Sequence, residues 1–257
     1  MQQGDLVRRL SRDSDIIFRI VSIDGNNVLL KGEVIRLVCT SQLDDLVPCS
    51  VDDVKSLTLP PLAESRRGPL LKGRVLHLDG DEQYLKKALR AYRQYDVKAI
   101  GYYLAEAKMP GAIETLLKRH HPDIVVITGH DALLDDRKEG YYDLGNYRNS
   151  AAFVEACKAC RTVKPDLDSL VVIAGACQSY YEALIESGAN FASSPSRENI
   201  HLLDPVIIAS ELAMSPVYEY VRVDKILANT INRNMGGLDT KGQARRIYLG
   251  GKSSHDT

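Results

Sequence analysis

Residues 123–130 read DIVVITGH and residues 170–177 read LVVIAGAC, and the two segments are alike. Each begins with an apolar, largely β-branched run, continues through small residues and ends in a side chain suited to acid–base or nucleophilic chemistry. Apolar runs without polar alternation are typical of strands buried on both faces of a parallel sheet. The two segments therefore predict neighbouring central strands of one parallel sheet, which end close to His130 and Cys177.

Strands and helices alternate along the chain around these two segments. Residues 75–80 and 97–104 have the composition of further strands, and residues 189–194 that of a short last one. Helical periodicity marks the segments between and after the strands: 81–95, 111–120, 150–160, 179–187, 202–213 and 223–231. This order predicts an α/β fold over residues 75–235, with a mostly parallel sheet covered by helices on both faces.

The N-terminal part of the chain follows a different pattern. It contains short runs of strand type at residues 15–23, 27–33 and 34–40. The sequence Asp-Gly-Asn-Asn at residues 24–27 is a hairpin signal between the first two runs. We expect a small β-barrel-like module of SH3-like size over residues 1–60. A linker is predicted at residues 61–74 because this stretch is rich in Pro, Gly and basic residues. A polar tail is predicted at residues 236–257.

Composition excludes several classes of function. The 257 residues hold 33 Lys and Arg against 34 Asp and Glu, so the balance argues against a dedicated binder of nucleic acid or of anionic membranes. The five cysteines are odd in number and irregularly spaced, which is typical of a reducing compartment. The first residues lack the apolar stretch of a signal peptide, so we expect a cytoplasmic protein.

His130 and Cys177 are the candidate catalytic residues. Functional side chains gather at the carboxyl ends of strands in an open parallel sheet, where the chain turns outward. A thiol needs a base or cation beside it to act as a nucleophile, and an imidazole on the neighbouring strand end can take that role. Gly129 and Ala176 leave room for a substrate backbone, and the amide groups of Asp131 and Cys177 are candidates to hold an oxyanion.

Together these segments resemble a known family. An apolar strand ending in His, followed by one ending in Ala-Cys, is similar to the caspase-like superfamily, in which the His also precedes the Cys by about 50 residues. The runs VLHLDGDEQYL (75–85) and DIVVITGHDAL (123–133), and the whole of residues 170–205, resemble more closely the YabG family of sporulation-specific proteases.

The resemblance implies a caspase-like three-layer sandwich with cysteine endopeptidase activity. It implies Cys177 as nucleophile and His130 as its partner, without metal or organic cofactor. The expected protein partners are spore-coat and germination proteins, processed in the sporulating cell, with association with the spore coat as a further expectation. In the caspase-like pattern Gly follows the His, whereas residue 131 is Asp here. Asp131 thus has three open roles: oxyanion donor, support for His130, or contact with substrate.

The acidic pair Asp79 and Asp81 stands at the carboxyl end of the strand at 75–80. Caspase-like peptidases often build the pocket for the residue before the cleaved bond at this strand end, and an acidic pair there suits Arg or Lys. The alternative is a turn in which Asp81 caps the next helix. With an Arg preference, the basic stretch at residues 66–75 is a candidate for self-cleavage; otherwise it is a solvated spacer.

Two other functions fit the same residues. One is a non-catalytic scaffold of the spore coat, in which the α/β domain and the β module hold an assembly together and Cys177 only packs in the core. The other is a hydrolase of non-peptide acyl or amide bonds, because a Cys–His pair does not by itself specify the leaving group. In the peptidase, the β module has two open roles: it recruits coat proteins, or it covers the cleft until it is removed.

Overall fold

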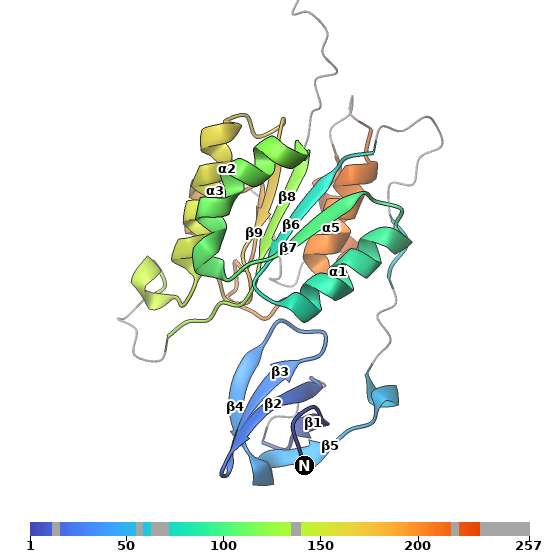
Figure 1. Ribbon diagram of the computed structural model, residues 1–257, viewed down its shortest axis with the longest axis vertical. Helices are drawn as coiled ribbons and strands as arrows, with labels where there is room; N and C mark the ends of the chain where they lie inside the picture. Colours follow the sequence, from blue (N-terminus) through green and yellow to red (C-terminus); the bar gives the residue numbers. More distant parts are fainter. Residues whose placement is uncertain (12–15, 55–58, 63–71, 135–139, 217–220, 232–257) are drawn as a thin grey trace, which may run out of the picture.

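The computed structural model describes residues 1–11, 16–54, 59–62, 72–134, 140–216 and 221–231 (Figure 1). The N-terminal unit is a five-stranded antiparallel sheet in the order β4-β3-β2-β1-β5. Its strands are β1 (Leu6–Arg9), β2 (Phe18–Asp24), β3 (Asn27–Gly32), β4 (Val38–Gln42) and β5 (Leu46–Pro48), with short 3-10 helices at Leu43–Asp45 and Val51–Asp53. The inward side chains form a small core of Val7, Phe18, Ile20, Val28, Leu30 and Leu46.

The second unit is built on a parallel sheet in the order β10-β9-β8-β6-β7. Its strands are β6 (Val75–Asp79), β7 (Ala99–Tyr103), β8 (Ile124–Thr128), β9 (Val171–Ala174) and β10 (Phe191–Ala192). As predicted, the segments ending near His130 and Cys177 are neighbouring parallel strands, and every residue of β8 and β9 is buried. The chain adds β7 on one side of β6 and β8 on the other, so a topological switch point lies between β6 and β8.

Helices cover both faces of the parallel sheet and confirm the predicted α/β class (Figure 1). One face packs against α1 (Glu82–Gln94), α5 (Asp204–Met214) and α6 (Val223–Ala228). The other packs against α2 (Met109–His120), α3 (Ser150–Val163) and α4 (Tyr181–Glu186). Further 3-10 helices lie at Glu106–Lys108 and Leu144–Asn146.

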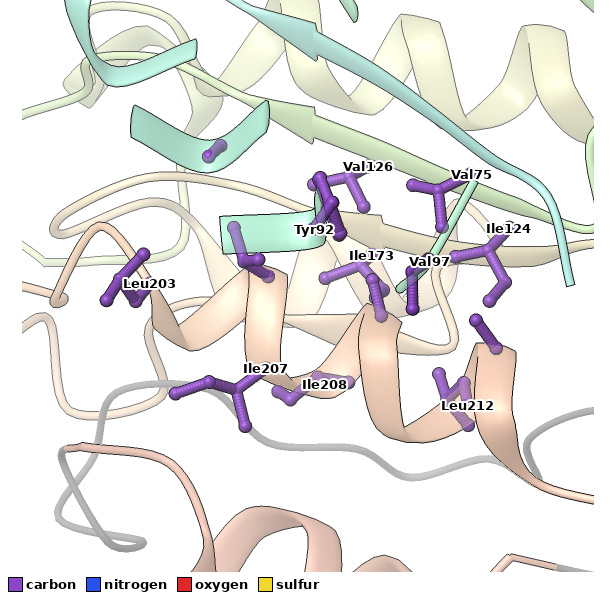
Figure 2. Close-up of a cluster of buried hydrophobic side chains, with 14 of the residues drawn as sticks. Val75, Tyr92, Val97, Ile124, Val126, Ile173, Leu203, Ile207, Ile208 and Leu212 are labelled. Carbon is purple, nitrogen blue, oxygen red and sulfur yellow. The ribbon is translucent and has the colours of Figure 1, made fainter. Parts of the chain in front are cut away.

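Helix α5 lies at the centre of the core on the sheet face that packs against α1 and α6. Its residues from Asp204 to Ala213 are all buried, which is typical of a helix without a solvent-facing side. Ile207, Ile208 and Leu212 of this helix belong to the same buried apolar cluster as Ile173 and Ile124 of the sheet, and Figure 2 shows the helix packed along the sheet. No helix within the described residues is long and apolar enough to cross a membrane.

The predicted strand at residues 34–40 is wrong in its first half. β4 begins only at Val38, because the chain turns tightly after β3: the Leu37 amide donates to the Ile35 carbonyl over 2.8 Å. Gly32 permits this turn, since a Cβ there would lie 2.3 Å from the Ile35 oxygen. Residues 34–36 thereby leave the N-terminal sheet and contact the second unit. The candidate cleavage stretch at 66–75 falls mostly, and the tail at 236–257 entirely, outside the described residues.

Candidate active site

Three adjacent strands of the parallel sheet end at one edge and carry the predicted site residues. Asp79 is the last residue of β6, Gly129 and His130 follow β8, and Cys177 follows β9 by three positions. β8 pairs with both β6 and β9, so these residues are brought to one edge of the sheet. Ligand sites of open α/β sheets lie at such a switch point, outside the carboxyl ends of the strands.

The space between the ends of β6 and β8 is filled by Arg36, from the loop between β3 and β4. Its Nη2 lies 2.6 Å from Asp79 Oδ2 and its Nη1 lies 3.1 Å from Asp79 Oδ1, which is a bidentate ion pair. Nη1 also lies 3.5 Å from the Gly129 carbonyl oxygen. The Tyr84 ring forms a wall, with its centroid 5.1 Å from the guanidinium carbon.

Asp79 is held ionised by its surroundings. Besides Arg36, it accepts hydrogen bonds from the Thr128 hydroxyl and the Asp81 amide, at 3.1 and 3.0 Å. Burial alone would raise the pKa of Asp79, but the charge of Arg36 and hydrogen bonds from His77 and Arg36 bring this pKa well below its usual range. A buried carboxylate at the end of β6 is therefore matched to one guanidinium.

The backbone around Arg36 pairs with the second unit like an added strand. Ile35 and His201 form an antiparallel bridge. The Arg36 amide donates to the Ile200 carbonyl at 3.0 Å, and the Leu202 amide donates to the Val34 carbonyl at 2.9 Å. An extended peptide bound to a free backbone edge gains main-chain hydrogen bonds in this way, while its side chains enter pockets.

The Cys177 thiol lies against the carbonyl group of Arg36. Its Sγ donates to the Arg36 carbonyl oxygen over 2.6 Å and accepts from the Ile200 amide at 3.2 Å. The side chain is almost fully covered, with 1% of its surface exposed. Burial raises the pKa of Cys177 to about 12, against the opposing effects of the Ile200 amide and the Arg36 charge. The thiol is thus protonated at neutral pH in this arrangement.

His130 has a different partner from Cys177. Its Nε2 lies 2.9 Å from Asp81 Oδ2, and its backbone amide donates to Glu106 Oε1 at 2.9 Å. No hydrogen bond joins the His130 ring to the Cys177 thiol, both of which are described. Asp81 also caps α1 by accepting from the Gln83 and Tyr84 amides, which confirms the capping interpretation. It forms an ion pair with Lys31 Nζ at 2.6 Å as well.

Asp131 lies in a buried network behind the two strand ends. Its carboxylate accepts from the Ser150 and Ser179 hydroxyls and from the Asn149 amide. Burial raises the pKa of Asp131, with these hydrogen bonds opposing. The Ser179 hydroxyl also accepts from the Ala176 amide at 2.9 Å, so the backbone beside Cys177 is tied to the same network.

Sequence reasoning missed the residues that cover the site. Arg36 carried one signal, a single charged side chain inside the apolar run Val34-Ile35-Arg36-Leu37-Val38. Ile200 and Leu202 gave no signal, because their role depends on backbone position. Among the described residues, no group of three or more His, Cys, Asp or Glu is placed to hold a metal ion. Cys157 and Cys160 are buried in the core between α3 and the sheet.

The fold and these contacts define an α/β protein with a thiol, an imidazole and a buried carboxylate at one sheet edge. A family model described as YabG peptidase U57 matches residues 2–67 and 62–248, and the chain belongs to this family. The chain is also 41% identical, over 95% of its own length and 96% of the relative's, to the sporulation-specific protease YabG of Bacillus subtilis (strain 168). No solved structure matches the chain. Family membership makes it a peptidase of a sporulation-specific family.

Proposed function

We propose that the protein is a cysteine endopeptidase that cuts after arginine, with Cys177 as nucleophile and His130 as acid–base partner. One observation carries the proposal: Arg36 is paired with Asp79 while its carbonyl oxygen lies 2.6 Å from Cys177 Sγ. A peptidase must hold the residue before the cleaved bond by its side chain and present its carbonyl group to the nucleophile. Arg36 occupies such a position.

The pocket favours arginine over lysine. Both oxygens of Asp79 face one guanidinium, and the Gly129 carbonyl oxygen lies near the same group. A planar guanidinium satisfies two carboxylate oxygens at once, whereas an ammonium group is a point charge that satisfies fewer fixed acceptors. Tyr84 adds a ring face beside the cation. Asp81 is not part of this pocket floor in the proposal, since its carboxylate is occupied by His130 and Lys31.

The reaction is acyl transfer. The His130 ring takes the thiol proton from Cys177, the sulfur attacks the carbonyl carbon, and the ring then protonates the departing amine. Water, activated by the same ring, hydrolyses the thioester. Asp81 orients the imidazole, and backbone amides at Gly129, Asp131 and Cys177 are the candidate donors to the oxyanion. The strand order and the His and Cys at neighbouring strand ends support a caspase-like arrangement.

The substrates in this proposal are spore-coat and germination proteins of the sporulating cell. The relative's name, a sporulation-specific protease, supports the setting. Flexible segments with an exposed arginine fit best, because residues before the cleaved bond must adopt an extended conformation along Ile200–Leu202.

A scaffold without catalysis is the second candidate, and the buried thiol favours it. Cys177 is covered, protonated and hydrogen-bonded to backbone groups, as a packing cysteine would be. In that case Arg36 and Asp79 serve only to join the two units.

The test is incubation of purified protein with a reduced, unfolded protein that contains Arg and Lys, followed by mass analysis of the fragment ends. We expect the wild type and Cys157→Ala to cut after Arg, and Cys177→Ala and His130→Ala to be inactive. Arg36→Gln is included because it opens the pocket. Absence of cleavage by all five proteins would support the scaffold. Turnover of small amides without cleavage of the protein would support the non-peptide hydrolase.

A further inference from the structure

The peptide bond between Arg36 and Leu37 lies where a substrate bond would lie. We propose that the enzyme cuts its own chain at this bond, within the same molecule. Until then, residues 34–36 block the substrate groove, which we define as the backbone edge at Ile200–Leu202 together with Cys177 and Asp79. The inference rests on the proposed function, but it concerns a different bond from the linker stretch at 66–75 and has its own test.

Three independent contacts present this bond to the site. The side chain of Arg36 is fully buried in the Asp79 pocket. The backbone on its N-terminal side is bridged to His201 in the antiparallel manner of an added strand. The carbonyl group of Arg36 touches Cys177. A salt bridge that served only to join the two units would need the first contact and neither of the others.

The chain on the other side of the bond is anchored away from the groove. The Leu37 amide donates to the Ile35 carbonyl, and the Leu37 carbonyl accepts from the Gly32 amide at 2.8 Å. From Val38 onward the chain is paired with β3. After cleavage, residues 37–42 therefore stay in the N-terminal sheet, whereas the new C-terminus at Arg36 is tethered on one side only. The cut frees residues 34–36 to leave the groove.

The cleavage uses only groups that are present, together with water. With Nε2 held by Asp81, the other ring nitrogen of His130 takes the thiol proton, and the sulfur forms a bond to the Arg36 carbonyl carbon. The bond from that carbon to the Leu37 nitrogen breaks, and the ring returns the proton to the new amine of Leu37. Water then hydrolyses the thioester to the Arg36 carboxylate and the free Cys177 thiol. Because burial raises the pKa of the Cys177 thiol, only a small fraction of it is thiolate, and the first attack is slow.

The test follows the full-length protein by intact-mass analysis over time at several protein concentrations. The wild type is expected to give fragments 1–36 and 37–257 at a rate independent of concentration. Cys177→Ala, Arg36→Gln and Arg36→Lys test the nucleophile and the pocket, and Arg8→Gln, an exposed arginine of the same unit, is the matched control. Thermal melting shows which variants fold. Arg8→Gln is expected to cut like the wild type, Arg36→Lys at least tenfold more slowly, and the other two not at all.

Mixing wild type with Cys177→Ala separates cutting within a molecule from cutting between molecules. The inactive protein is expected to stay intact at residue 36, because its own groove covers the bond. Cleavage of the inactive protein at the wild-type rate would overturn the proposal.

The proposal also fails if the bond stays intact while wild type or Arg36→Gln cuts the unfolded test protein after Arg in a Cys177-dependent way. Either result would leave the proposed function standing. Cutting by Arg36→Gln alone would make residues 34–36 a pure inhibitor, and cutting by uncut wild type would show that they do not block the site. If no variant cuts either the Arg36–Leu37 bond or the unfolded test protein, both the self-cleavage proposal and the proposed function are overturned.

Discussion

The guanidinium of Arg36 and the carboxylate of Asp79 form an ion pair in which neither side chain has any exposed surface. The two residues come from different units, 43 positions apart, and the pair spans the boundary between the antiparallel and the parallel sheet. Burying two charges is costly unless each satisfies the other, and removing one partner leaves the other uncompensated. The contact therefore bears on stability, and in the proposed enzyme it also sets the preference for arginine.

Removing the charge of Asp79 should destabilise the protein strongly. We expect Asp79→Asn to lower the free energy of unfolding by about 3–5 kcal/mol, the usual cost of breaking a buried pair from one side. The double variant Arg36→Gln/Asp79→Asn should cost less than the sum of its two single variants. Urea unfolding of the four proteins measures this cycle, and additive single effects would show that the pair is not coupled.

The same pair predicts a pH dependence of stability. Because the pKa of Asp79 lies well below its ordinary value in the folded state, the unfolded chain binds this proton more readily as pH falls. The stabilisation is complete above about pH 5, beyond the ordinary Asp pKa of about 4, and is lost as pH falls below it. The stability difference between wild type and Asp79→Asn should shrink from pH 6 to pH 3. If the stability difference between wild type and Asp79→Asn stayed constant from pH 6 to pH 3, Asp79 would not be the ionised partner of Arg36 in the folded state.

Covering of Cys177 should make its thiol slow to react. With a pKa of about 12, its thiolate fraction at pH 8 is on the order of 10³-fold below that of an ordinary thiol. We expect iodoacetamide to label the partly exposed Cys49 well before Cys177. Arg36→Gln should speed the labelling of Cys177 and leave that of Cys49 unchanged. Fast labelling of Cys177 in the intact wild type would mean that residues 34–36 do not cover it.

Asp81 serves both helix α1 and His130, and one substitution separates the two roles. Asn caps a helix about as well as Asp, so Asp81→Asn should keep α1, while loss of the ion pair with Lys31 lowers the melting temperature without unfolding the protein. The carboxylate that orients the imidazole is lost, and kcat should fall at least tenfold with KM nearly unchanged. Kinetics on an arginyl peptide amide give both constants. A normal kcat in the folded variant would remove Asp81 from the catalytic account.

Much of the parallel sheet was predictable because its strands are unbroken apolar runs between helical periods. The segments 123–130 and 170–177 indicated adjacent buried strands by composition alone, and the parallel pairing of β8 with β9 confirms it. The capping role of Asp81 followed from its place after a strand and a glycine. Each of these features is determined by residues close together in the sequence, so the sequence alone is enough to predict it.

The covering of the site was not predictable, because it depends on contacts between distant residues. Residues 34–40 have the composition of one strand, and a turn held by Gly32 and the pairing of Arg36 with Asp79 divides that run. Nothing near Ile200 indicates that its amide and carbonyl groups contact Cys177 and Arg36. Tertiary contacts overrode the local preference for a strand at the point where the two units meet.

The most direct measurement of the central claim is covalent trapping with a Val-Ile-Arg chloromethyl ketone, followed by peptide mapping of the adduct. The probe copies residues 34–36 and places an electrophile at the position of the Arg36 carbonyl group. We expect one adduct, on Cys177. It should form faster in Arg36→Gln than in wild type. A Val-Ile-Asp probe should react with the same cysteine at least tenfold more slowly than the Val-Ile-Arg probe. Labelling of several cysteines, or equal rates of labelling with the Arg and the Asp probe, would contradict the assignment of Cys177 and the Asp79 pocket to one active site.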